Sequence, residues 1–390
     1  MHFILAALVS LLPLASAHTT FTTLFVDGVN QGDGVCVRMN QDPYKAGYPV
    51  NPSSKNMACG FDGEQGVSRV CPANASSTLT FEFRIYADGA QPGAIAPSHK
   101  GPCAAYMKRV PDATEDNNAA GDGWFKIFES TYDESAGQWC TEKLIENNGH
   151  LSVKIPADIR PGYYLVRPEL LALHGAALDQ PDPQFYVGCA QVFVQGSGSA
   201  MPENVRIGEG TYDLSSTPGL TFNIYETPMK LPYPMFGPPV YDSSGEAEKQ
   251  VHISGGGSLE KGDPIVQTIG LKPEGCILIR DNWCGFEVPS YTTEEGCWNS
   301  SENCWDQSDV CWNTAPPTGP ANCNIWQKKC EELDDSCRNG DFNGPPHEGK
   351  VLTPTLPSLE REPVIFERAL HGRGPSRMPG HRRVRGHGHF

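Results

Sequence analysis

Fourteen cysteines restrict the fold of this 390-residue chain more than any other feature, because each must be disulfide-bonded, metal-bound or a reactive thiol. The N-terminus decides between these uses. An apolar run over residues 3–14 is followed by Ala15-Ser16-Ala17, an A-x-A cleavage pattern. The run is far shorter than the roughly 20 residues that span a bilayer, so it predicts a signal peptide over residues 1–17. We therefore expect a secreted, extracellular protein whose cysteines are mostly paired.

Composition indicates a β protein. Glycine and proline (41 and 34 residues) make up about 19% of the chain, against roughly 12% in average domains. Between residues 18 and 241, short alternations of apolar and polar residues such as 79–85 and 151–155 are separated by Gly/Pro/Asn loops. This pattern predicts an all-β, immunoglobulin- or fibronectin-like β-sandwich with long loops. The net charge of −16 disfavours nucleic acid and anionic membranes as partners.

A second unit is predicted over residues 274–345, after a polar, glycine-bearing linker at 242–273. It holds eight of the 14 cysteines and five of the seven tryptophans. Six of its cysteines form two series with a spacing of seven residues, about two helical turns, and a proline-rich segment separates the series. We expect a helical hairpin stapled by Cys311–Cys323, Cys304–Cys330 and Cys297–Cys337, with Cys276–Cys284 at its entry. A zinc site is the weaker alternative, because secretion favours disulfides and no C-x-x-C spacing occurs.

Three tryptophans of this unit, Trp298, Trp305 and Trp312, also recur every seven residues. On a helix they would be about 10.5 Å apart along the axis, which is of the order of a disaccharide repeat in an extended glycan. The alternative, slightly favoured, is that they pack a small disulfide-rich core.

The C-terminal segment 346–390 has eight basic and four acidic residues and is rich in Gly, Pro and His. Such a composition cannot bury a core, so we expect a basic, histidine-containing disordered tail.

Cleavage after Ala17 would leave His18 as the N-terminal residue. Its α-amine and imidazole could chelate one metal ion, because a free α-amino group loses its proton at modest cost. A second histidine would complete three nitrogen ligands, a donor set that suits copper. The alternative is that the cleavage site precedes a histidine by coincidence.

Five segments in order carry a family resemblance. They are the strand ending Val26-Asp27-Gly28, the S-H-x-G-P segment within residues 97–102, Leu171-Ala172-Leu173-His174 with Gln184-Phe185-Tyr186, residues 219–225, and residues 237–241. Together they resemble the fungal lytic polysaccharide monooxygenases of auxiliary activity family nine, formerly glycoside hydrolase family sixty-one. The resemblance covers residues 18–241, and the extension at 274–345 resembles cysteine-rich extensions of unknown role.

The resemblance implies one copper ion per chain, held by His18 through its amine and ring and by His99 through its ring. Tyr186 would lie at the axial position, and His174 and Gln184 would orient and protonate oxygen species. The alternative is that His174 and Tyr186 are ordinary core residues. Arg167, in the strand leading to His174, is a further candidate for this network.

The implied activity is oxidative cleavage of glycosidic bonds in cellulose or related β-glucans, with an external electron donor and O₂ or H₂O₂. Tyr233, Tyr44 and Tyr48 are candidates for stacking on the polysaccharide, although the last two could simply pack their loop. We expect a monomer. The alternatives are a copper-binding or copper-transfer protein with the same histidine brace, or a cell-wall-binding protein acting through the tryptophan unit.

The resemblance also implies a Cys59–Cys189 disulfide. Four cysteines, Cys36, Cys71, Cys103 and Cys140, would form two further bridges whose pairing stays open. The sequons at Asn74 and Asn299 predict glycosylation in surface loops.

Overall fold

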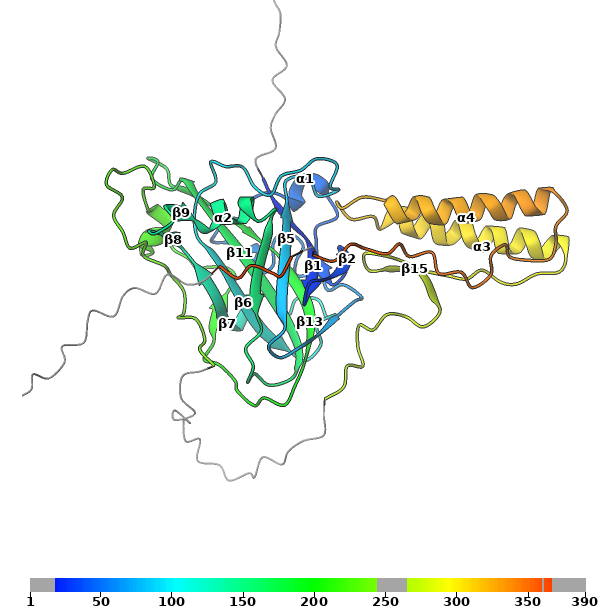
Figure 1. The fold of residues 1–390 in the computed structure, drawn as a ribbon, viewed down its shortest axis with the longest axis horizontal. Coiled ribbons are helices and arrows are strands. Elements are labelled where there is room, and N and C mark those ends of the chain that lie inside the picture. Colours follow the sequence, from blue (N-terminus) through cyan, green and yellow to red (C-terminus); the bar gives the residue numbers. More distant parts are fainter. Residues whose placement is uncertain (1–17, 244–264, 360, 367–390) are drawn as a thin grey trace, which may run out of the picture.

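The computed structural model describes residues 18–243, 265–359 and 361–366, except the side chains at positions 43 and 44. The predicted signal peptide and most of the predicted linker lie outside the described residues. Two packed sheets form the main body (Figure 1). The smaller sheet has the order β10-β5-β1-β2. Its strands are β1 (Thr20–Val26), β2 (Val29–Asp33), β5 (Thr78–Arg84) and β10 (His150–Lys154).

The larger sheet has the order β14-β7-β6-β11-β13-β3, with β12 paired to β11 and β4 paired to β13. Its strands are β3 (Val37–Arg38), β4 (Cys71–Asn74), β6 (Cys103–Val110), β7 (Gly121–Ser130), β11 (Gly162–Gly175), β12 (Asp182–Val187), β13 (Cys189–Gln195) and β14 (Val205–Ile207). The prediction of an all-β sandwich is therefore confirmed.

Two apolar clusters follow from strand alternation, because successive side chains point to opposite faces of a sheet. Val166 and Leu170 of β11 face the cluster between the sheets, whereas Leu165 and Leu171 belong to a second cluster on the other face. Long loops cover this second face. The elements outside the two sheets are α1 (Pro43–Ala46), η1 (Lys55–Met57), β8 (Tyr132–Asp133), β9 (Gln138–Trp139), α2 (Cys140–Glu146) and η2 (Pro218–Thr221). Of these, α2 packs against the cluster between the sheets through Leu144.

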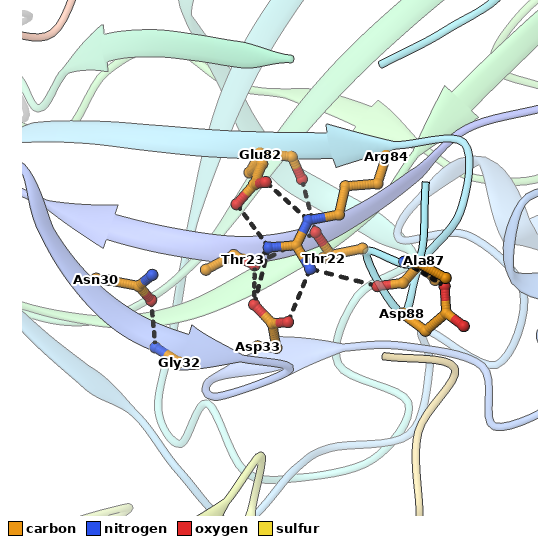
Figure 2. Close-up of polar contacts among 10 residues, drawn as sticks. Thr22, Thr23, Asn30, Gly32, Asp33, Glu82, Arg84, Ala87 and Asp88 are labelled. Atoms are coloured by element: carbon orange, nitrogen blue, oxygen red, sulfur yellow. Dashed lines mark hydrogen bonds and ion pairs between the residues drawn. The ribbon is translucent and has the colours of Figure 1, made fainter. Parts of the chain in front are cut away.

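Arg84 joins strands β5 and β2 at the edge of the smaller sheet (Figure 2). Its guanidinium lies 2.7 Å from a carboxylate oxygen of Asp33 and 2.7 Å from one of Glu82. Burial alone would lower the pKa of Arg84, but the hydrogen bonds to Glu82 and Asp33 outweigh it and raise that pKa. Arg84 therefore stays positively charged at this edge of the sheet.

The C-terminal unit is a β-hairpin followed by two antiparallel helices, which extend from the side of the sandwich (Figure 1). The prediction of a small disulfide-rich helical hairpin is confirmed. The Thr293 hydroxyl accepts from the Gly296 amide and caps the first helix. The elements are β15 (Cys276–Arg280), β16 (Trp283–Phe286), α3 (Glu294–Asn313) and α4 (Ala321–Arg338).

All fourteen cysteines are paired in the structure. The two helices are joined by three disulfides, with a fourth in the β-hairpin: Cys297–Cys337, Cys304–Cys330, Cys311–Cys323 and Cys276–Cys284. The sandwich contains Cys59–Cys189, and the four cysteines left open by the sequence pair as Cys36–Cys71 and Cys103–Cys140.

Two predicted boundaries are wrong. Gln267 is buried and donates to the carbonyl of Val70, so the end of the predicted linker belongs to the sandwich. The first part of the predicted disordered tail returns to the sandwich. Ile365 forms a parallel bridge with Ser152 of β10, and Phe366 is buried in the core between the sheets. A few apolar residues in a Pro-rich segment suffice to anchor it there. No helix among the described residues is long and apolar enough to cross a membrane.

Candidate metal centre

His18 and His99 are brought together by the start of β1 and the loop that precedes β6. Thr19, next to His18, donates its hydroxyl to the carbonyl of Ala94 in that loop at 2.5 Å. The same loop runs alongside β11, because the amide of Leu173 in β11 donates to the Lys100 carbonyl. Gly101 permits this approach, because a Cβ there would overlap the carbonyl oxygen of Leu171. The glycine of the S-H-x-G-P segment thus positions His99.

Tyr186 lies close to both histidines. Its ring centroid is 6.3 Å from that of His18 and 5.9 Å from that of His99. His174 lies closer still to His99, with a centroid separation of 4.2 Å. Strands β11 and β12 are adjacent, and their register shifts after Ala172, so His174 leaves the regular ladder next to the site. The structure thus gathers four of the residues that the resemblance singled out.

The imidazole of His99 is buried and held neutral. Burial, together with the nearby His174 and His18, lowers its pKa to about 4, although a hydrogen bond with Gln184 opposes the shift. Burial also lowers the pKa of His18. Neutral imidazoles are the form that binds metal ions, so both rings are prepared for coordination near neutral pH.

A short chain of hydrogen bonds fixes Tyr186. Its hydroxyl donates to Oε1 of Gln184 at 2.9 Å, and the Gln184 amide donates to Asp182 at 2.9 Å. Burial raises the pKa of Tyr186 above its usual range, and the charge of Asp182 adds to this shift. The phenol therefore stays protonated. Sequence reasoning did not include Asp182 in the site.

His174 has an unsatisfied nitrogen at the site. Its Nδ1 atom is buried and meets no hydrogen-bond partner among the described residues. Burial lowers the pKa of His174, and the charge of Asp182 opposes this shift. A buried polar atom without a partner costs free energy, so it marks a position where a further group is expected to bind.

The site fits a copper ion in its donor chemistry. No group of three or more His, Cys, Asp or Glu side chains in the described part of the chain could hold a metal ion. A brace of His18 and His99 needs only two imidazoles, with the α-amine of His18 as the third nitrogen. That amine exists only after the bond to Ala17 is cut. Three nitrogen ligands and a weak tyrosine oxygen suit copper better than Mg²⁺ or Ca²⁺, which prefer oxygen ligands.

The candidate substrate tyrosines differ in their exposure. Tyr48 is 47% exposed and its ring lies edge-on to His18, with a centroid separation of 5.0 Å. Tyr233 is only 6% exposed, and its hydroxyl donates to the carbonyl of Gly219. It packs against Trp139 and Phe222, so its prediction as a surface tyrosine is wrong. The Tyr44 side chain lies outside the described residues.

Two further expectations are corrected. Arg167 is fully buried, pairs with Glu169 at 2.7 Å and donates to the carbonyl of Met57, a residue of the second apolar cluster. These contacts do not join it to His174. The two sequon asparagines are exposed but do not lie in loops. Asn74 ends strand β4, and Asn299 lies on α3.

Comparison with known proteins agrees with this geometry. The family model of Auxiliary Activity family 9 (formerly GH61) matches residues 18–233. The chain is 63% identical over 359 residues to AA9 family lytic polysaccharide monooxygenase C of Aspergillus tamarii, covering 92% of this chain and 95% of that protein. It is 57% identical to lytic polysaccharide monooxygenase A of Emericella nidulans, covering 91% of this chain and 61% of that protein. The solved structure of CvAA9A, 33% identical, superposes with a TM-score of 0.52 over 59% of this chain and all of that one. The chain therefore belongs to auxiliary activity family 9, the lytic polysaccharide monooxygenases.

Proposed function

We propose that this monooxygenase is secreted, binds one copper ion per chain, and oxidatively cleaves glycosidic bonds in cellulose or related β-glucans. An external electron donor and O₂ or H₂O₂ would be its co-reactants. The observation that carries the proposal is the convergence of His18, His99 and Tyr186 at one place, with His174 beside His99.

His18 and His99 would hold the metal. Copper, when bound, supplies the one-electron chemistry that activates the oxidant. Both imidazoles have lowered pKa values, so little proton competition opposes binding. Tyr186 keeps its proton, because its pKa is raised, and it would therefore offer the metal a weak, neutral phenol oxygen. Gln184 holds that hydroxyl in place.

His174 and Gln184 would manage protons and orientation. The free Nδ1 of His174 can accept a proton or a hydrogen bond from a group bound at the site. Gln184 accepts from Tyr186 and donates to Asp182, so its amide has a defined orientation. Asp182 provides a negative charge that favours protonated His174. These residues form a donor and acceptor set beside the brace.

Tyr48 is the strongest candidate for contact with the polysaccharide. It is exposed beside His18, so its ring can stack on a sugar face near the proposed copper ion. We also propose that the protein acts as a monomer without nucleic acid or membrane partners, and that Asn74 and Asn299 carry glycans.

A copper-binding or copper-transfer protein with the same brace is the alternative. The ordered set of His174, Gln184 and Tyr186 favours the enzyme, because binding alone needs only the brace nitrogens.

The test uses the secreted, copper-loaded protein with cellulose, a reductant and H₂O₂, and analyses soluble products by mass spectrometry. We expect oxidised oligosaccharides, which should disappear together with copper affinity in His99→Ala. His347→Asn is the matched control, since His347 is exposed and Asn tolerates its positive φ of 55°. Absence of oxidised products from several β-glucans and chitin, with copper tightly bound, would favour the copper-transfer alternative.

A further inference from the structure

A tryptophan stripe, defined here as Trp298, Trp305 and Trp312, runs along α3 on the outside of the helical hairpin. Trp298 is 41% exposed and Trp312 is 39% exposed. Trp305, between them, is half-buried, and its indole nitrogen lies 3.4 Å from a carboxylate oxygen of Asp334 on α4. The stripe therefore lies beside the seam between α3 and α4.

The three indoles share one face because of their spacing. Seven residues make about two turns, so successive members are about 10.5 Å apart along the axis and drift by only about 20°. Each follows a cysteine that bonds α4, in the disulfides Cys297–Cys337, Cys304–Cys330 and Cys311–Cys323. These bonds prevent the helices from separating or sliding, so α4 keeps a constant position beside the stripe.

The unit does not need two of these tryptophans for its core. Trp326 of α4 is fully buried and its indole donates to the carbonyl of Cys304. Leu278 and Leu333 complete a buried cluster with the cystines, and Trp298 and Trp312 are absent from that cluster. Exposing large indoles costs free energy that Lys or Glu at the same positions would avoid. This exposure decides against the core-packing alternative for both residues.

We propose that the tryptophan stripe is a binding platform for an extended, neutral β-1,4-linked glucan chain. Its indoles recur at an interval comparable with two sugar residues of such a chain, and aromatic faces stack on the apolar faces of sugars. Asp334 and Arg338, which form an ion pair at 3.2 Å beside Trp305, supply hydrogen-bonding groups for sugar hydroxyls. Helix α3 carries five acidic residues and no basic one, which disfavours nucleic acid and anionic glycans as occupants.

Hydrogen bonds join the unit that carries the stripe to the catalytic sandwich. The side chain of Asn282 donates to the Gly34 carbonyl at 3.0 Å, and the Ser68 hydroxyl donates to the Asn282 carbonyl at 2.8 Å. After α4 the chain returns, and the Leu359 amide donates to the Gly28 carbonyl at 3.0 Å. A glucan chain on the stripe would therefore keep the copper site near the polysaccharide surface. The proposal rests on the proposed function for its substrate class.

The test measures binding without catalysis, so that it is independent of the copper chemistry. The full chain, stripped of metal and of N-glycans (Asn299 adjoins Trp298), is titrated with insoluble cellulose, and free protein is measured. We expect W298A/W312A to bind at least about tenfold more weakly than wild type, from the loss of two stacking surfaces. Phe286→Ala, which removes another exposed aromatic of the same unit, should bind like wild type.

Several results would overturn the proposal. One is equal binding by W298A/W312A and wild type, and another is an equal loss in Phe286→Ala. A third is a wild-type dimer in sedimentation that the double variant abolishes without any change in cellulose binding, because the stripe would then contact a second copy of the chain. A protein that binds cellulose through the stripe but yields no oxidised products would leave the platform intact and refute the proposed function instead.

Discussion

The imidazole rings of His99 and His174 lie with their centroids 4.2 Å apart and their planes inclined by 34°. His99 belongs to the loop before β6, and His174 to the irregular end of β11. Each ring's positive charge would disfavour a charge on the other, so neither is expected to be an imidazolium at neutral pH. A proposed metal ligand and a proposed proton-handling residue are therefore coupled through space.

If His18 and His99 hold copper as proposed, copper affinity should depend on a free α-amine at His18. Placing one extra alanine before His18 turns its α-amine into an amide, which has no free lone pair for copper at neutral pH. We expect copper affinity to fall by more than about 100-fold, measured by isothermal titration with the copper ion. The same extension on His99→Ala should have little further effect, and full affinity in the extended protein would contradict the brace.

The hydroxyl of Tyr186 is predicted to matter more for the copper environment than for affinity. Tyr186→Phe keeps the buried ring but removes the 2.9 Å hydrogen bond to Gln184. We expect a change in the Cu(II) electron paramagnetic resonance spectrum, a stability loss of about 1 kcal/mol, and copper affinity within about tenfold of wild type. Tyr164→Phe, which also removes a tyrosine hydrogen bond in the sandwich, is the control and should leave the spectrum unchanged.

The Arg167–Glu169 pair is predicted to be structural. Both side chains are almost fully buried, and Arg167→Leu would leave Glu169 charged without a partner. We expect a loss of about 3–5 kcal/mol in unfolding free energy, most of it recovered in the double variant R167L/E169L. Chemical denaturation of the three proteins measures this. Recovered stability in the double variant, together with normal copper affinity, supports a structural role for the pair. A selective loss of copper binding would instead show that Arg167 acts in the metal site.

Asp281 is predicted to make stability depend on pH. Burial raises its pKa to about 6, against the opposing charge of Arg280 at 3.0 Å. Because the folded state holds this proton more tightly than the unfolded state, the stabilisation is complete below about pH 4 and is lost as the pH rises through 6. Unfolding free energy should therefore fall by about 2 kcal/mol between pH 4 and 6.5 through this group alone.

Other carboxylates and histidines titrate in the same range, so the measured quantity is the difference between wild type and Asp281→Asn. Asn can adopt the positive φ of 40° found at this position. A pH slope that is identical in the two proteins would show that Asp281 is not the group responsible.

Much of the site could be predicted, because its motifs are local and their order is preserved. His18 follows a cleavage pattern, and His99 lies in a segment whose glycine is needed for close contact with β11. Asp182 was not predicted as part of the site, since an exposed acidic residue before a proline carries no distinctive signal. Its contact with Gln184 arises within β12, where two residues that are two positions apart place their side chains on one face of the strand.

The amino-acid sequence determined the features that arise from periodicity and from chemistry within one segment. Alternation specified the sandwich, and seven-residue spacing placed the cysteines of two helices opposite one another. The structure alone decided the features that depend on which surfaces meet. Tyr233 is covered by Trp139 and Phe222, and Phe366 is buried in the core although its segment is basic and proline-rich. Burial of a single side chain is set by neighbours distant in sequence, and local composition does not specify those neighbours.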